Sequence, residues 1–354
     1  MIITRAPLRI SFLGGGTDYP EYFTAEGGAV LATAIDQYAY ITANHFHSEL
    51  FDYSIRIAYR KVELAHALDD IQHIPFREAL RQCGISRDIE LNYMADLPAF
   101  TGLGSSSSFT VALLQALHAY CGRYRSGLEL AYEAIHLERH VLADQVGCQD
   151  QVLAAVGGFN LIEFRAEDDI LVHRLALSPR RIKELERHLM LFFTGIRRSA
   201  SEVAGKQIQR ISENRSVLRA MRALVDDGVD TLTSAAPIAD FGELLHRSWL
   251  LKRSLDGGVT CSAIDQMYER ARAAGAVGGK LLGAGGGGFL LVVARPEDHV
   301  HIREQMAQFP SLSISLAAPG SQLSQGERPL PEPREIYVAA IGGGGDRKPP
   351  AYTA

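Results

Sequence analysis

The chain has 354 residues, of which 47% are hydrophobic and 22% are charged, as in a globular protein with a sizeable core. Its formal charge of -5 provides no overall attraction to nucleic acid or to an anionic membrane, so neither is expected as a partner. No apolar run is long enough to span a bilayer, and no signal-peptide pattern follows Met1. The cysteines form no CxxC or zinc-binding pattern, so we expect a cytoplasmic protein with reduced thiols.

Strands are expected to dominate the first half of the chain. β-branched and aromatic residues bounded by Gly, Pro and Asp predict strands over residues 2–4, 8–13, 30–35, 39–43, 55–59 and 89–93. Two helices are predicted here, over residues 109–120 and 128–142. Within residues 8–13 the alternate apolar side chains share one face of the strand, which places Arg9 and Ser11 on the other.

The second half mixes helices with strands, so periodicity alone predicts two halves of mixed structure. An acidic stretch at residues 166–169 and a Ser-Pro-Arg-Arg break at 178–181 predict a junction between domains over residues 1–170 and 185–340. The second domain is expected to contain strands over residues 189–194 and 289–294 and helices over residues 199–226, 241–254 and 262–274. A glycine run and two prolines predict a flexible tail over residues 341–354.

A glycine and serine run between the strand 89–93 and the helix 109–120 is typical of a phosphate site. Glycines allow the backbone to approach an anion, and a helix N-terminus offers free N–H groups and a positive dipole end. One serine would suffice as a plain helix cap, which is the alternative. No Lys-Ser or Lys-Thr follows the glycines, so the loop is not a Walker A motif. The predicted phosphate loop consists of Thr101, Gly102, Leu103, Gly104, Ser105, Ser106, Ser107 and Ser108.

The strand 8–13 ends in a second glycine turn, formed by Gly14, Gly15 and Gly16, which delivers Thr17 and Asp18 to its mouth. A carboxylate at that place suits bidentate hydrogen bonding to vicinal sugar hydroxyls. The alternative is a tight turn that Asp18 closes through its own side chain.

Glu138 falls on the apolar stripe of the helix 128–142, where a carboxylate needs a cation or a hydrogen-bond donor to offset its desolvation. Mg2+ would serve, and an arginine at a domain edge is the alternative. His136 and His140 flank it at i, i+4 spacing, but the segment has no HExxH pattern and no third soft ligand for zinc. Asp150, between two glutamines and before an apolar stretch, is a candidate base or orienter for a hydroxyl nucleophile.

A third glycine loop, over residues 283–288, formally contains GxGxxG. A dinucleotide-binding fingerprint follows a strand and opens a helix, whereas we expect a helix before this loop and a strand after it. We therefore expect Gly285 and Gly286 to support the phosphate loop or the substrate by close backbone approach.

Taken in this order, PLRISFLGGGTDY, PAFTGLGSSSS and KLLGAGGGGF resemble the three signature motifs of the GHMP small-molecule kinases. The resemblance spans residues 4 to about 295. Phe100 departs from it, because the family usually has a small residue before the loop. The resemblance implies a two-domain α+β fold, with an N-terminal domain like ribosomal protein S5 domain 2 and a ferredoxin-like C-terminal domain, and with ATP and substrate in the cleft between them.

The resemblance also implies roles for residues at matching positions. Ser106, with Ser105 as the alternative, would hold Mg2+ together with Glu138. Asp150 would take or orient the proton of the acceptor hydroxyl, and Arg9 would lie near Asp150 and the transferred phosphoryl group. The glycines of the second motif would wrap the ATP phosphates. Phosphoryl transfer needs mainly positioning and charge neutralisation, which this set can supply.

Within the family, APLRISFLGGGTDY resembles the opening of the sugar kinases, and GCQDQVLAAVGGFN and LFFTGIRRSAS resemble bacterial heptose 7-phosphate kinases. This implies phosphorylation of the C1 hydroxyl of D-glycero-D-manno-heptose 7-phosphate, with Arg197, Arg198 and Lys206 available for the substrate phosphate. A solvated helix start is the alternative for these cations. The alternative functions are a hexose 1-kinase like galactokinase, and a decarboxylase or inactive sugar sensor of the same fold. The sequence leaves monomer and homodimer open.

Overall fold

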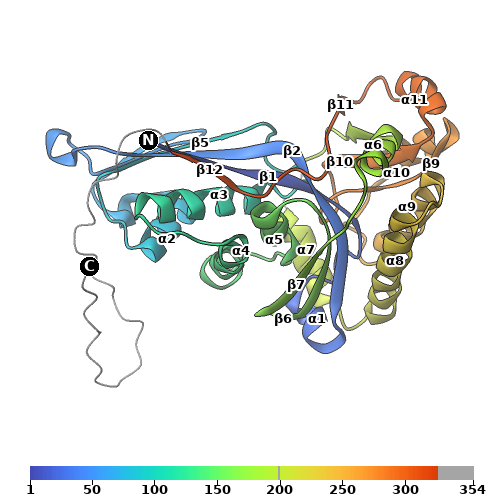
Figure 1. Ribbon diagram of the computed structural model, residues 1–354, viewed down its shortest axis with the longest axis horizontal. Coiled ribbons are helices and arrows are strands. Elements are labelled where there is room, and N and C mark those ends of the chain that lie inside the picture. Colours follow the sequence, from blue (N-terminus) through green and yellow to red (C-terminus); the bar gives the residue numbers. More distant parts are fainter. Residues whose placement is uncertain (198–199, 326–354) are drawn as a thin grey trace.

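The computed structural model describes residues 1–197 and 200–325, which form two sheets with helices packed against them (Figure 1). The larger, eight-stranded sheet has the order β12-β1-β2-β5-β3-β4, with β6 paired to β2 and β7 paired to β6. β3 and β5 run parallel, and the other pairs are antiparallel. Its strands are β1 (Ile2–Leu13), β2 (Gly28–His45), β3 (Ile55–Ala58), β4 (Val62–Ala65), β5 (Ile89–Ala95), β6 (Phe159–Ala166), β7 (Asp169–Arg174) and β12 (Gln322–Gln325).

β1 and β2 are each longer than predicted, because each joins two of the expected strands. Pro7, which lacks an N–H group, separates the two predicted pieces of β1. The chain continues through this proline with a shift of register between Pro7 and Arg9, so the irregularity is a bulge and not the end of a strand. The acidic residues 166–169 lie at the turn of the β6–β7 hairpin within this sheet.

Helices α2 to α5 cover one face of the large sheet (Figure 1). Two helices were expected before residue 165, and that number is wrong. The structure has α1 (Pro20–Glu26), α2 (Ile74–Cys83), α3 (Ser105–Tyr120), α4 (Gly127–His136), continued by a π-helical turn (Leu137–Val141), and α5 (Gln149–Val156), with short 3-10 turns at Ser48–Leu50 and Leu68–Asp70. The buried residues of α2, Phe76, Ala79, Leu80 and Cys83, recur at helical spacing, a signal that predicts this helix.

The second sheet has four antiparallel strands in the order β11-β8-β10-β9. Its strands are β8 (Leu189–Phe193), β9 (Ala276–Leu281), β10 (Phe289–Ala294) and β11 (Ser311–Leu312), and its helices are α6 (Pro179–His188), α7 (Ala200–Gln209), α8 (Arg215–Thr233), α9 (Ile238–Arg253), α10 (Ser262–Ala273) and α11 (His299–Gln305), with a 3-10 turn at Pro296–Asp298. From β8 onward the order is one strand, four helices, two strands, one helix and one strand, which is the ferredoxin-like β-α-β-β-α-β order with four helices, α7 to α10, in the place of its first helix. The predicted helix 199–226 is two helices, α7 and α8, separated by residues 210–214.

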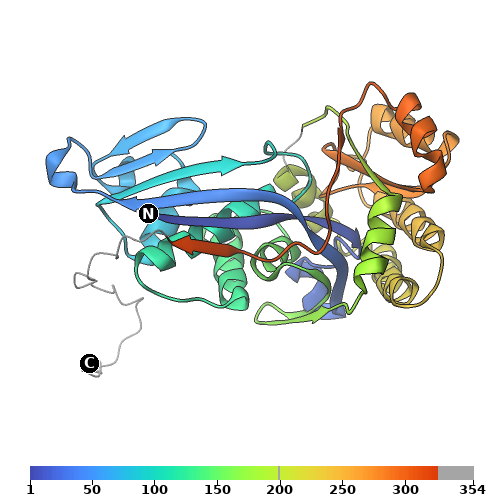
Figure 2. The same ribbon diagram turned by 45° about the horizontal axis from the view of Figure 1, so that its top comes forward.

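The two halves share one of the hydrophobic core clusters, and a strand that follows the second half joins the first sheet. Phe12 of β1 stacks on Phe159 with ring centroids 5.5 Å apart and meets Phe241 of α9 edge-on at 5.4 Å. β12, near the end of the described chain, returns to pair with β1, as Figure 2 shows. The contact of Phe12 with Phe241 and the pairing of β12 with β1 thus join the two halves. None of the helices in the described part of the chain is long and apolar enough to cross a membrane. The four cysteines are free thiols.

Candidate active site

Arg9 and Asp150, predicted to lie near each other, form a two-pronged ion pair. Nε of Arg9 donates to Oδ1 of Asp150 and NH2 donates to Oδ2, both at 2.6 Å. The Arg9 side chain is 6% exposed and that of Asp150 is 22% exposed. Such a fork fixes the plane of the carboxylate, and it leaves Asp150 the more accessible member of the pair.

The phosphate loop lies directly against this pair. NH1 of Arg9 donates to the carbonyl of Gly102 at 2.7 Å, and the Arg9 backbone N–H donates to that of Leu103 at 3.0 Å. Gly104 has a φ of +76° and is the N-cap residue of α3. A Cβ on Gly104 would lie 3.2 Å from Oδ2 of Asp150, so a side chain here would crowd the carboxylate. Asp150 therefore lies at the N-terminus of α3, where an anion is favoured.

The four serines of this loop divide into two pairs. Ser107 and Ser108 are buried: Ser107 Oγ donates to Oε2 of Glu138 at 2.9 Å, and Ser108 Oγ donates to the carbonyl of Pro7 at 2.7 Å. Ser105 is partly exposed and Ser106 is exposed. Ser106 precedes Ser107 by one residue, so its side chain is turned by 100° about the helix axis. No serine acts as the cap, because the N-cap residue is Gly104 and no side chain caps the helix there. The structure thus brings Ser107, and not Ser106, to Glu138.

Glu138 lies in the π-helical turn that follows α4 and is 1% exposed. Its Oε2 accepts hydrogen bonds from Ser107 and, at 2.6 Å, from Nε2 of Gln151. No arginine is among these partners, so the expected alternative of an arginine pair is not observed. Among the described residues its buried Oε1 has no hydrogen-bond partner. Burial raises the pKa of Glu138 to about 7.

An unpartnered carboxylate oxygen beside a serine hydroxyl and a phosphate loop fits the ligand set that Mg2+ takes with a nucleotide. Magnesium prefers oxygen ligands and is usually held by one or two carboxylates together with substrate phosphates. Glu138 would be the carboxylate, and Ser107 or the exposed Ser106 would supply the hydroxyl.

Thr17 and Asp18 build the turn that follows β1. Thr17 is 0% exposed, and its hydroxyl donates to the carbonyls of Gly14 and Ala29, so it holds the turn from inside. Asp18 accepts from the backbone N–H groups of Gly16 at 3.0 Å and Gln149 at 3.4 Å. Burial and the charge of Asp150 raise the pKa of Asp18. The side-chain-closed turn given above as the alternative is present, and it joins the first motif to the start of α5.

The third glycine loop, residues 283–288, packs backbone against backbone on the phosphate loop. The N–H of Phe289 donates to the carbonyl of Thr101 at 3.0 Å, and a Cβ on Gly102 would lie 2.7 Å from the carbonyl oxygen of Leu282. Gly285 and Gly286 lie against Val259, to whose carbonyl Gly286 donates at 2.8 Å. A strand, β9, and not a helix, directly precedes the loop, so the loop closes a β9–β10 hairpin.

Two buried lysines that the sequence did not single out belong to the same region. Lys280 of β9 donates to the carbonyl of Phe12 at 2.8 Å, and Lys252 of α9 donates to the carbonyls of Leu281 and Gly283. Burial, with Arg9 nearby, lowers the pKa of Lys280 to about 7, and burial beside Lys280 lowers that of Lys252. A lysine inside an apolar, glycine-flanked strand, as in GGKLLGAGGGG, is the sequence signal for such a group.

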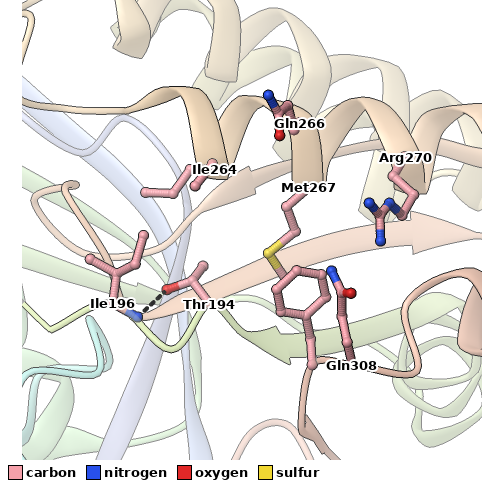
Figure 3. Close-up of a pocket in the computed structure, with 9 residues that line it drawn as sticks. Thr194, Ile196, Ile264, Gln266, Met267, Arg270 and Gln308 are labelled. Carbon is pink, nitrogen blue, oxygen red and sulfur yellow. Dashed lines mark hydrogen bonds between the residues drawn. The ribbon is translucent and has the colours of Figure 1, made fainter.

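Arg197 and Arg198 were predicted to bind a substrate phosphate. Arg197 is exposed, and its guanidinium carbon lies 6.0 Å from the centroid of the Phe193 ring, so nothing places it beside Asp18 or Asp150. Arg198 lies outside the described residues. A cavity of about 140 Å³ lies in this part of the molecule, between the end of β8 and α10 (Figure 3), and none of the predicted site residues lines it.

Comparisons with known proteins identify the family of the chain. The model of the GHMP kinases N terminal domain matches residues 73–158, and that of the GHMP kinases C terminal domain matches residues 234–311. The D-glycero-alpha-D-manno-heptose 7-phosphate kinase of Campylobacter jejuni is 30% identical over 307 residues, which are 83% of this chain and 90% of that protein. A galactokinase of Thermotoga maritima is 25% identical over 345 residues, 86% of this chain and 92% of the galactokinase.

The fold is shared with solved structures as well. A D-glycero-D-manno-heptose 1-phosphate kinase from Bacteroides thetaiotaomicron superposes with a TM-score of 0.77 at 22% identity, over 93% of this chain and 100% of that chain. All three motifs, the two-domain α+β architecture and the relative from Campylobacter jejuni lead to one assignment. The chain belongs to the GHMP kinase family and is a phosphotransferase.

Proposed function

We propose that this protein transfers the γ-phosphoryl group of ATP to the anomeric C1 hydroxyl of a heptose 7-phosphate, giving the 1,7-bisphosphate for nucleotide-activated heptose synthesis. The observation that carries the proposal is the Arg9–Asp150 ion pair at the N-terminus of α3, which places a fixed carboxylate beside the phosphate loop. The likeness to the Campylobacter jejuni heptose 7-phosphate kinase supports the choice of sugar.

In this mechanism Asp150 accepts the proton of the C1 hydroxyl as that oxygen attacks the γ-phosphorus. A positioned carboxylate in this role is typically worth about 100-fold to 10,000-fold in rate. Arg9 keeps the Asp150 carboxylate in place, and its positive charge stabilises the negative charge that develops on the transferred group. The free N–H groups at the start of α3 bind the phosphates of ATP.

Glu138 and a serine of the loop, Ser107 or Ser106, would hold Mg2+. The bound ion would neutralise charge on the phosphate oxygens. Asp18, Gly15 and Gly16 form the turn that faces the sugar. Gly285 and Gly286 of the third glycine loop line the acceptor site as well. Arg197 and Arg198 are proposed for the distal phosphate of the substrate.

A hexose 1-kinase is the second candidate, because the Thermotoga maritima galactokinase is also similar over most of its length. A screen that measures ADP release with ATP and Mg2+ separates the two candidates. D-glycero-D-manno-heptose 7-phosphate should be turned over faster than free galactose or mannose. Equal or faster turnover of a free hexose would transfer the assignment to the second candidate, and absence of ADP release with every sugar would favour a GHMP-fold protein that is not a sugar kinase.

A further inference from the structure

Two buried polar side chains beside the proposed catalytic pair have side-chain oxygens without a partner. Ser11 is 6% exposed and Gln149 is 9% exposed. Within residues 1–197 and 200–325, neither Oγ of Ser11 nor Oε1 of Gln149 has a hydrogen-bond partner. A buried oxygen that has lost water and gained no donor costs free energy, which a bound hydroxyl group would recover.

Each of these two side chains is a near neighbour in sequence of one member of the Arg9–Asp150 pair. Ser11 follows Arg9 by two residues on β1, so both point to the same side of the strand. Gln149 is the first residue of α5 and directly precedes Asp150. Ser11 and Gln149 also converge on Gly15, since a Cβ built there would lie 3.5 Å from Ser11 Oγ and 3.8 Å from Gln149 Nε2.

Neither the backbone conformation nor a steric clash requires a glycine at position 15. Gly14 and Gly16 have φ angles of 82° and 98°, in the region that favours glycine, whereas Gly15 is not among the residues with positive φ. The contacts that a Cβ at Gly15 would make are ordinary van der Waals distances. A side chain could therefore be accommodated there, and its absence leaves room in front of Ser11 and Gln149.

The position of the space at Gly15 relative to the phosphate loop indicates which substrate it can receive. Gly104 of the phosphate loop approaches one side of the Arg9–Asp150 pair, with its Cβ position 3.2 Å from Asp150 Oδ2 and from Arg9 Cγ. Ser11 and Gln149 approach Gly15, in the turn that Asp18 closes. In the proposed function this turn faces the sugar, which assigns Ser11 and Gln149 to the acceptor and not to the nucleotide phosphates.

We propose that Ser11, Gln149 and the open side of Gly15 form a subsite that binds hydroxyl groups of the acceptor sugar other than the one that reacts. The serine hydroxyl and the glutamine amide each donate and accept hydrogen bonds, which matches neighbouring hydroxyls of a polyol. This inference rests on the proposed function, because it takes the acceptor to be a sugar. A site built to hydrogen-bond a hydroxyl rejects analogues that lack it, so the subsite would contribute to the choice of acceptor.

The test compares three variants with the wild type in steady-state kinetics, with ATP and D-glycero-D-manno-heptose 7-phosphate as substrates. Gln149→Met and Ser11→Ala remove the polar atoms, and Gly15→Ala keeps them but fills the space. We expect each to raise the KM for the sugar by about tenfold or more and to leave the KM for ATP within about twofold. The matched control is Gln115→Met in α3, which also removes a glutamine whose buried Oε1 has no partner, and it should leave both KM values unchanged.

Monodeoxy analogues of the sugar separate direct contact from a structural effect. Removing the hydroxyl that Gln149 binds should weaken sugar binding by the wild type about tenfold, and it should hardly change sugar binding by Gln149→Met. Equal losses in both proteins for every analogue, or equal rises of the KM values for ATP and sugar, would overturn the subsite. Calorimetric titration of the sugar without ATP keeps the proposals distinct. If the wild type binds the sugar but transfers no phosphate, the proposed function fails. Weaker sugar binding by Gln149→Met than by the wild type would still support the subsite in that case. Equal binding by both proteins, or none, overturns it.

Discussion

Lys280 of β9 and the carbonyl of Phe12 in β1 are joined by a buried hydrogen bond of 2.8 Å that crosses between the two sheets. Phe12 lies three residues beyond Arg9 and two before the glycine turn of the first motif. The Lys280 side chain thus fixes the end of β1, and with it the turn that carries Asp18, to the hairpin that carries the third glycine loop.

Replacing Lys280 with Met should reduce kcat/KM for the sugar by about tenfold, because the turn loses its anchor. The folded-state pKa of about 7 lies below the ordinary 10.5, so the unfolded chain binds the extra proton between these values. The stability of the wild type should therefore rise with pH from about 7 to 10, and Lys280→Met should flatten this rise. Urea unfolding at pH 6, 8 and 10 measures it. Lys61→Met, at an exposed position, is the control, and an unchanged pH profile in Lys280→Met would refute the prediction.

Glu138→Gln should abolish most turnover yet stabilise the metal-free protein at pH 8. The folded pKa of about 7 lies above the ordinary 4.5, so the stability of the wild type falls as pH rises through this interval. The variant should be more stable than the wild type by about 1 to 3 kcal/mol at pH 8 and by little at pH 4.5. Thermal unfolding with EDTA checks this.

Glu133→Gln, five residues earlier, provides a control of opposite sign. Although burial opposes it, hydrogen bonds from His118 and Arg125 lower the pKa of Glu133, so this substitution should destabilise the protein at pH 8. Full activity of the wild type in EDTA, or of Glu138→Gln with Mg2+, would contradict the assignment of Glu138 to the metal.

Asp150→Asn should lower kcat by about 100-fold to 10,000-fold, because the amide cannot take the proton of the acceptor hydroxyl. The KM for ATP should change little, since the phosphate loop keeps its backbone contacts. Steady-state ADP release measures both constants, with Asp168→Asn in the β6–β7 turn as a control. If kcat survives, Asp150 only supports Arg9 and the base lies elsewhere.

Arg197→Ala should raise the KM for a phosphorylated sugar by the equivalent of about 1.5 to 3 kcal/mol, as expected for one charge-assisted hydrogen bond, with the KM for ATP unchanged. The comparison of heptose 7-phosphate with the corresponding free sugar isolates the phosphate. Arg198→Ala is the partner experiment. Equal KM values for the phosphorylated sugar in wild type and both variants would leave these arginines as a solvated surface.

Phe100→Gly should stabilise the protein by up to about 1 kcal/mol, because Phe100 has a φ of 65° and is 55% exposed. Relief of the backbone strain, worth about 1 to 2 kcal/mol, is partly offset by the larger conformational entropy of glycine in the unfolded chain. Phe51→Gly, at an equally exposed phenylalanine with a φ of -127°, should instead destabilise or have no effect. Urea unfolding of both variants gives the comparison, and destabilisation by Phe100→Gly would show that its ring makes contacts worth more than the strain.

The sequence predicted the parts of the site that local order determines. Arg9 and Ser11 alternate with core residues along a strand, and the glycine and serine run sits between a strand and a helix, so their faces follow from period and spacing. The sequence does not show at which residue of that run the helix begins. A start one residue later turns every side chain by 100° about the helix axis. Ser106 was therefore expected where Ser107 contacts Glu138.

Other features depend on contacts between segments far apart in the chain. Lys280 looks like a polar interruption in an apolar strand until Phe12 is brought beside it, 268 residues away in sequence. The π-helical turn that holds Glu138 keeps the hydropathy pattern of a continuing helix. The domain limits at residues 170 and 185 stay a prediction. The pairing of β12 with β1 could not be expected from them, because it adds residues 322–325 to the sheet that begins at residue 2.

The pairing of β12 with β1 gives the chain a vulnerable period during its synthesis. β1 leaves the ribosome long before β12, and the edge of β1 that β12 will cover presents unpaired N–H and C=O groups until β12 arrives. At about 5 to 20 residues per second the interval lasts about 15 to 60 seconds. Throughout it, the strand that carries Arg9 can pair with the edge of another nascent chain, so soluble yield should depend on the rate of synthesis and on chaperones that cover exposed strand edges.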